Sequence, residues 1–127
     1  MREAAQFPRF SDAEMAARHG QVEAFMETQG IDALLVFGAG RFAAEVYWLT
    51  DWPGGREAYV VFQKGQAPAV IAQLYNHLPM ARVLSVIEDV RWAGADTART
   101  VGEFLAGRGL KGGKVGVVGA VPYRPYL

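Results

Sequence analysis

The pattern of apolar positions near the start of the chain predicts an amphipathic helix over residues 12–29. Apolar side chains recur at helical spacing at Met15, Val22, Phe25 and Met26. Ser11 and Glu14 have the spacing of a capping box, in which the serine hydroxyl accepts a free backbone N–H at the helix start and the glutamate side chain reaches back to accept another. Gly30 is suited to end the helix, because glycine adopts the left-handed conformation at little cost.

Other apolar segments predict strands. The apolar run at 31–37 is typical of a strand that is buried on both faces, and residues 114–119 predict a last buried strand. Segments 57–62 and 67–72 are rich in β-forming residues and flank a short turn that contains glycine. This arrangement predicts an antiparallel hairpin. A further strand is expected within residues 83–92.

Shorter helical patterns separate the strands. Residues 42–49 predict a short helix, and Asp96 is placed to cap a later one. The apolar face of this later helix is expected to carry Val101, Phe104 and Leu105. Segment 74–84 leaves helix and loop both open, because Pro79 interrupts any long helix there.

The order of these elements predicts an α/β fold, a mixed sheet with helices on both faces. A chain of 127 residues has room for one domain, and we expect residues 1–127 to form it. Segment 121–127 contains two prolines and neither a helical pattern nor a polar tail. We interpret it as the start of a linker to a following domain.

Charge and composition reduce the range of functions that the chain could have. Thirteen basic and thirteen acidic residues balance, and no segment gathers the basic ones, which argues against a nucleic-acid or anionic-membrane partner. Cysteine is absent, which excludes disulfides, thiolate nucleophiles and thiolate metal sites within the chain. No apolar run approaches the roughly 20 residues that span a bilayer, and no signal peptide is recognisable. We therefore expect a cytoplasmic protein.

Residues 38–43, GAGRFA, have the G-x-G-x-x-A form of a dinucleotide-binding fingerprint directly after a predicted strand. That mechanism also needs a parallel βαβ return and an acid about 20 residues further on, at the end of a strand. Glu57 has roughly that separation, but it opens a strand, and the next two strands form a hairpin. We favour a tight strand-to-helix turn, with nucleotide binding as the alternative.

Candidate ligands for a metal are scattered. His19 and Glu23 are spaced i, i+4 on the predicted helix, a spacing that can bind metal but that a polar helix surface often produces by chance. His77 has no obvious partner. Glu88 and Asp89 are adjacent, so on a strand their side chains point to opposite faces. We predict neither a catalytic nor a metal site within this chain.

Residues 47–56 have the most unusual composition, because three aromatic side chains and an arginine flank a Pro-Gly-Gly turn. One interpretation places Tyr47 and Leu49 in the core and uses a tryptophan to cover the sheet. The other presents the turn from Trp52 to Arg56 as an exposed contact surface. We expect both to apply, with some of the aromatic side chains in the core and the turn exposed.

Four segments carry a resemblance to a known family. They are GIDALLV at 30–36, YWLTDW at 47–52, the strand and turn REAYVVFQKGQAP at 56–68, and KVGV at 114–117. In this order they resemble the creatinase/prolidase N-terminal domain. Two departures stand out: Trp48 is inserted in a Tyr-Leu-Thr pattern, and Asp51 stands where the family has glycine.

The resemblance implies a ribonuclease H-like three-layer fold with no catalytic site of its own. In that family the domain precedes a catalytic "pita-bread" domain, which holds two divalent metal ions (Mn, Co or Zn) with two Asp, one His and two Glu. The parent enzymes are Xaa-Pro aminopeptidases, Xaa-Pro dipeptidases and creatinase. They are commonly homodimers, in which the N-terminal domain helps to form the subunit interface and covers the partner's active site.

The resemblance also implies two contact residues. By position, Arg56 matches an arginine that reaches a neighbouring subunit's site in creatinase-like members. Trp52 lies near an aromatic residue that does likewise.

Two hypotheses follow. The first is a non-catalytic N-terminal domain of a metal-dependent Xaa-Pro peptidase or a related C–N hydrolase. The second is a stand-alone α/β module that binds a nucleotide or small metabolite through residues 38–43.

Overall fold

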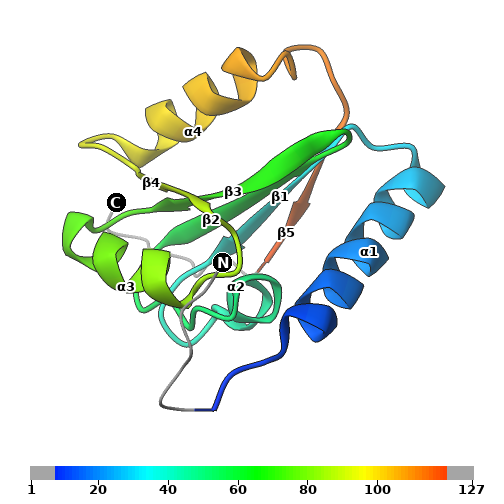
Figure 1. The fold of residues 1–127 in the computed structure, drawn as a ribbon. Coiled ribbons are helices and arrows are strands. Elements are labelled where there is room, and N and C mark those ends of the chain that lie inside the picture. The colour runs from blue at the N-terminus through cyan, green and yellow to red at the C-terminus, as the bar shows by residue number, and fades with distance from the viewer. Residues whose placement is uncertain (1–7, 120–127) are drawn as a thin grey trace.

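The computed structural model describes residues 8–119, and its elements follow the predicted order (Figure 1). The helices are α1 (Asp12–Gln29), α2 (Ala44–Thr50), α3 (Leu78–Leu84) and α4 (Thr97–Gly107), with a 3₁₀ turn at Tyr75–His77. The strands are β1 (Ala33–Gly38), β2 (Ala58–Gln63), β3 (Gln66–Ala72), β4 (Asp89–Trp92) and β5 (Val115–Val118). The predicted linker at 121–127 lies outside the described residues.

The strands of residues 8–119 form one mixed sheet in the order β4-β3-β2-β1-β5. β2 and β3 form the predicted antiparallel hairpin around Lys64 and Gly65. β1 is antiparallel to β2 and parallel to β5, and β3 is parallel to β4. The carboxyl ends of β1, β3, β4 and β5 therefore meet at one end of the sheet, together with the start of β2. We refer to this as the carboxyl end of the sheet.

Helices cover both faces of the sheet, which confirms the predicted three layers (Figure 1). On one face, residues of α1, α2 and α3 share a core cluster with alternate strand residues such as Leu34 and Val60. On the other, Val101 of α4 shares a smaller cluster with Ile71 and Ala93. We call these the three-helix face and the α4 face.

The serine cap and the glycine cap of α1 are confirmed, but the Glu14 carboxylate accepts from Arg18 Nε at 3.0 Å instead of reaching back to the start of the helix. The Ser11 hydroxyl accepts from the backbone N–H of Glu14 at 3.1 Å, and Gly30 adopts φ 63°. Met15, Val22 and Met26 are buried as expected, but Phe25 is 49% exposed. At 100° per residue Phe25 lies about 80° from the line through Met15, which turns its ring away from the sheet.

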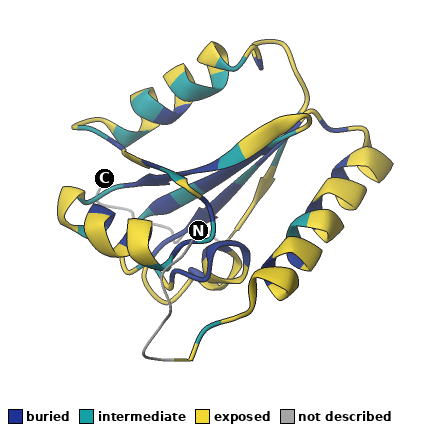
Figure 2. Ribbon diagram, viewed as in Figure 1, coloured by how far each residue is buried: buried dark blue, intermediate teal, exposed yellow. Residues whose placement is uncertain are grey.

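The prediction that the last strand is buried is wrong. In β5, Val117 is 69% exposed and Val118 is 36% exposed (Figure 2). Among the described strands β5 pairs with β1 alone, so one of its sides lacks a neighbour. The cluster beneath α4 reaches Leu35 of β1 but does not include β5.

Segment 74–84, which the sequence left open, is helical. Leu78–Leu84 forms α3 because Pro79 falls in its first turn, where a missing N–H leaves no hydrogen bond unmade. Leu78 and Ala81 of this helix are buried against the sheet.

Candidate functional site

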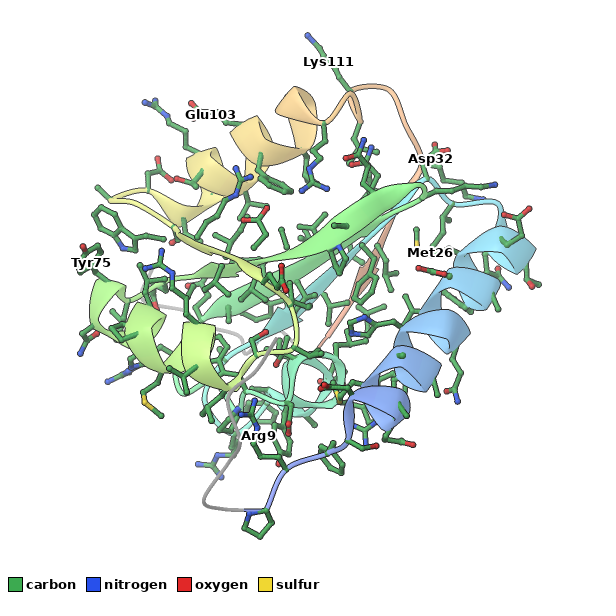
Figure 3. All side chains as sticks on the ribbon, in the orientation of Figure 1. Arg9, Met26, Asp32, Tyr75, Glu103 and Lys111 are labelled. Atoms are coloured by element: carbon green, nitrogen blue, oxygen red, sulfur yellow. The ribbon has the colours of Figure 1, made fainter. Side chains whose placement is uncertain are left out.

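A polar depression of about 300 Å³ lies at the carboxyl end of the sheet. Its walls come from the segment after β1, the residues before β2 and the residues after β3. The lining residues are Ala39, Gly40, Gly55, Arg56, Glu57, Gln73 and Leu74. Tyr75, labelled in Figure 3, stands next to this region and packs edge-on against Trp92 with the ring centroids 5.4 Å apart.

The G-x-G-x-x-A segment forms one wall as a tight turn. A Cβ at Gly38 would lie 2.9 Å from Ala43 Cα and 2.8 Å from Val46 Cγ2, so glycine is needed for this close approach. Ala39 and Phe42 close the turn with reciprocal backbone hydrogen bonds of 3.3 and 3.0 Å. The chain then continues through the seven-residue α2 into the antiparallel β2. This geometry favours the turn interpretation over a nucleotide fingerprint.

Arg56 is the charged lining residue of the depression whose side chain has no partner among residues 8–119. Its side chain is exposed, and its guanidinium makes no hydrogen bond or ion pair with any residue in 8–119. An arginine offers five N–H donors in a planar fork that matches a carboxylate or phosphate. The structure thus leaves the whole donor set of Arg56 available to a ligand.

Glu57 is held in place beside it. The Tyr59 hydroxyl donates to Glu57 Oε1 at 2.5 Å. Burial first, and then this hydrogen bond, raise the pKa of Tyr59 above its ordinary value. The Glu57 backbone carbonyl accepts from Gln73 N–H at 3.0 Å, and the Gln73 carbonyl accepts from Trp92 Nε1 at 3.1 Å. The side chain and backbone of Glu57 are therefore held by hydrogen bonds, whereas the guanidinium of Arg56 is not.

Trp52 lies elsewhere. Its side chain is 4% exposed, within the cluster of the three-helix face, so the prediction that it belongs to an exposed turn is wrong. The Thr50 hydroxyl accepts from Trp52 N–H at 2.9 Å and donates to the Val46 carbonyl at 2.7 Å, which directs the chain inward after α2. The ring meets that of His77 edge-on at 6.5 Å. The exposed part of the turn is formed by Pro53, Gly55 and Arg56.

Both histidine rings pack against aromatic side chains. His19 Nε2 lies 2.7 Å from the Leu49 carbonyl oxygen, and the imidazole packs edge-on against Phe62 at 5.0 Å. His77 contacts Trp52. Within residues 8–119, no three His, Asp or Glu side chains gather closely enough to hold a metal ion. In the same part of the chain, none of the helices combines the length and the hydropathy of a membrane span.

Sequence reasoning missed part of the depression. Gln73 and Leu74 were not predicted to lie beside Glu57. Because Ala58 pairs with Ala72, the preceding Glu57 must stand opposite Gln73. A register counted outward from the turn at 64–65 would have paired Glu57 with Ala72 instead, because the structure has a register shift between Val61 and Gln63.

A second, apolar groove of about 380 Å³ was also missed. It runs between α1, α2 and β5 and is lined by Val22, Leu34, Val36, Ala44, Glu45, Trp48, Leu49 and Val118. Trp48, one of its lining residues, is 39% exposed.

The model of the creatinase/prolidase N-terminal domain matches residues 18–126 of this sequence. The chain belongs to this family. As a creatinase/prolidase N-terminal domain it contains the α1 helix from Arg18, the whole sheet and the depression around Arg56. None of the curated proteins matches it closely enough to be reported as a relative.

Solved structures share the fold of this creatinase/prolidase N-terminal domain. An Xaa-Pro aminopeptidase structure from Streptococcus pyogenes has a TM-score of 0.67 at 17% identity, covering 85% of this chain and 94% of that one. The prolidase from Pyrococcus horikoshii OT3 has a TM-score of 0.61 at 21% identity, covering 84% and 27%. The N-terminal domain of the cytoplasmic peptidase PepQ from Mycobacterium tuberculosis H37Rv has a TM-score of 0.54 at 16% identity, covering 80% and 91%. The chain thus corresponds to about a quarter of the prolidase.

Proposed function

We propose that this domain is the non-catalytic N-terminal part of a cytoplasmic, metal-dependent Xaa-Pro peptidase that acts as a homodimer. In this proposal the domain contributes to the dimer interface and covers the neighbouring subunit's active site, where Arg56 contacts the substrate. The metal ligands would lie in the separate catalytic domain. Family membership supports the proposal, as do structural neighbours that are named as Xaa-Pro aminopeptidases and prolidases.

The observation that carries the proposal is the unpaired guanidinium of Arg56 at the rim of a polar depression. Exposed arginines often pair with a nearby carboxylate, yet the adjacent Glu57 is engaged by Tyr59. An arginine on a turn at the end of a sheet can reach beyond its own domain. A peptide substrate presents a carboxylate that suits bidentate recognition by such a group.

Kinetics of the full-length protein test the proposal. Arg56→Ala is expected to raise KM about 10- to 100-fold, because a hydrogen bond to a charged group contributes about 1.5–3 kcal/mol. The bound metal, measured by elemental analysis, should be unchanged, since Arg56 is proposed to lie outside the metal site.

Arg41→Ala is the matched control. Arg41 is also exposed and also makes no hydrogen bond or ion pair with the described residues, but it does not line the depression. Its removal should leave KM within about twofold of the original value. A KM for Arg56→Ala equal to that of Arg41→Ala would contradict the proposal.

A further inference from the structure

The turn that presents Arg56 begins at a residue in an unusual conformation. Asp51 adopts φ 65° and ψ 9°, and it is the one non-glycine residue of 8–119 with positive φ. A residue with a Cβ is less stable than glycine in this left-handed region. Glycine at this position would avoid the strain, and this chain has an aspartate there.

Arg9, whose side chain is largely covered, forms an ion pair with this aspartate. Arg9 Nε lies 3.6 Å from Asp51 Oδ2, and the two side chains are 10% and 3% exposed. The same guanidinium donates through Nη2 to the carbonyls of Leu84 at 2.5 Å and Val83 at 3.3 Å. Arg9, labelled in Figure 3, therefore joins the segment before α1 to the C-terminal ends of α2 and α3.

The backbone on both sides of Asp51 is also fixed. Asp51 N–H donates to the Tyr47 carbonyl at 2.9 Å and ends α2. On the other side Trp52 enters the core. Gly54 and Gly55 then follow with φ 71° and 159°, conformations that side chains rarely adopt. Because Pro53 and these two glycines separate Trp52 from Arg56, the direction of the turn depends on how firmly its first residues are held.

We propose that Arg9 and Asp51 form a latch that positions the turn carrying Arg56. The Arg9 guanidinium holds Asp51 in its left-handed conformation and ties it to the end of α3, and this fixes where the exposed part of the turn begins. Arg9 and Asp51 act as positioning residues, with no contact to substrate. The link from the latch to substrate binding rests on the proposed function, whereas the latch itself does not.

A double-mutant cycle tests the pairing in the 127-residue chain. Asp51→Gly removes both the strain and the carboxylate, so its effect on the melting temperature should depend on Arg9. In the Arg9→Gln background, which keeps an N–H donor but removes the charge, Asp51→Gly should raise the melting temperature by several degrees. In the original background the gain should be smaller or reversed, because a buried arginine then loses its carboxylate. Equal shifts in the two backgrounds would overturn the latch.

Amide hydrogen exchange tests the positioning. Arg9→Gln should increase the exchange rates of Gly54, Gly55 and Arg56 roughly tenfold, since the turn opens more readily when its first residue is released. Lys64→Ala is the matched control, because it breaks the ion pair of 2.6 Å between Lys64 and Glu27 at exposed positions outside the turn.

Rates at residues 54–56 that are equal in these two variants would show that Arg9 has a stabilising role alone, and would overturn the proposal. This measurement involves no catalysis, so an unchanged KM in Arg56→Ala would remove the proposed function and leave the latch intact.

Discussion

Within residues 8–119, three helices pack on one face of the sheet and a single helix packs on the other (Figure 1). The three-helix face holds a continuous apolar cluster that runs from Val22 of α1 to Val90 of β4. The cluster of the α4 face has three buried members, Ile71, Ala93 and Val101. The cluster of the three-helix face is therefore the larger one, although Phe37, Val61 and Ala69 are also buried on the α4 side of the strands.

The α4 face relies more on charged and aromatic contacts. Two guanidinium groups lie close to the ring of Phe104, with Arg91 Cζ at 4.8 Å and Arg108 Cζ at 4.6 Å from its centroid. Asp89 accepts from Arg91 at 2.8 and 3.0 Å and lies 3.6 Å from Arg108. Such contacts contribute less than apolar burial when they are partly exposed. We therefore expect most of the folding free energy to come from the three-helix face.

The largest expected effect comes from removing the same side chain from a helix on each face. Leu78 of α3 is 3% exposed and belongs to the large cluster, whereas Leu105 of α4 is half-buried. Leu78→Ala should lower the free energy of unfolding by about 3 kcal/mol and Leu105→Ala by less than about 1.5 kcal/mol. Both changes replace leucine by alanine in a helix, so differences in helix propensity largely cancel. Urea denaturation measures both, and equal losses would break the comparison.

A second pair compares two positions within the α4 face. Val61 and Val117 flank Leu35 in the same row of the sheet, but Val61 is fully buried and Val117 is 69% exposed. Valine to threonine keeps the β-branched shape and adds a hydroxyl. Val61→Thr should cost about 1–3 kcal/mol, because the hydroxyl is taken out of water. Val117→Thr should stay within about 0.5 kcal/mol. A comparable loss of unfolding free energy for Val117→Thr in urea denaturation would mean that β5 is covered in solution.

These contrasts explain which features the sequence could predict. The extent of α1, the hairpin and β1 follow from local signals: caps, a turn glycine and an unbroken apolar run. The apolar run of β5 is equally clear, yet it does not reveal that the strand lies at the border of the sheet. Burial of a strand depends on what packs beside it, and local pattern carries no such information.

The candidate site also combines features that local sequence predicts with features that depend on distant contacts. Arg56 could be singled out because a charge beside a Pro-Gly-Gly turn is expected at the surface. The burial of Trp52 could not, because it depends on the hydroxyl of Thr50 turning the chain inward. The ion pair between Arg9 and Asp51 joins residues 42 positions apart along the chain, and no spacing rule brings such residues together.

The smallest expected effect is a pH-dependent difference in stability that comes from Tyr59 on the α4 face. Tyr59 lies on the α4 face, where its ring packs on Phe37 at 5.1 Å and its hydroxyl donates to Glu57. Its pKa is raised in the folded state, so folding favours the neutral phenol. The resulting stabilisation is present below the unfolded pKa of about 10 and is lost as the pH rises above it.

Tyr59→Phe removes this titration and also one hydrogen bond. Near pH 7 it should lower the free energy of unfolding by about 1 kcal/mol, as expected for a partly exposed hydroxyl. Between about pH 9 and pH 11 the original protein should lose stability more steeply than the variant, so that the two curves converge. Urea denaturation across this range measures the difference, and other lysine, arginine and tyrosine titrations cancel between the two proteins. If the free energies of unfolding of the two proteins changed in parallel with pH, solvent would reach the Tyr59 hydroxyl freely. The α4 face would then be less covered at the carboxyl end of the sheet than the burial of Tyr59 indicates.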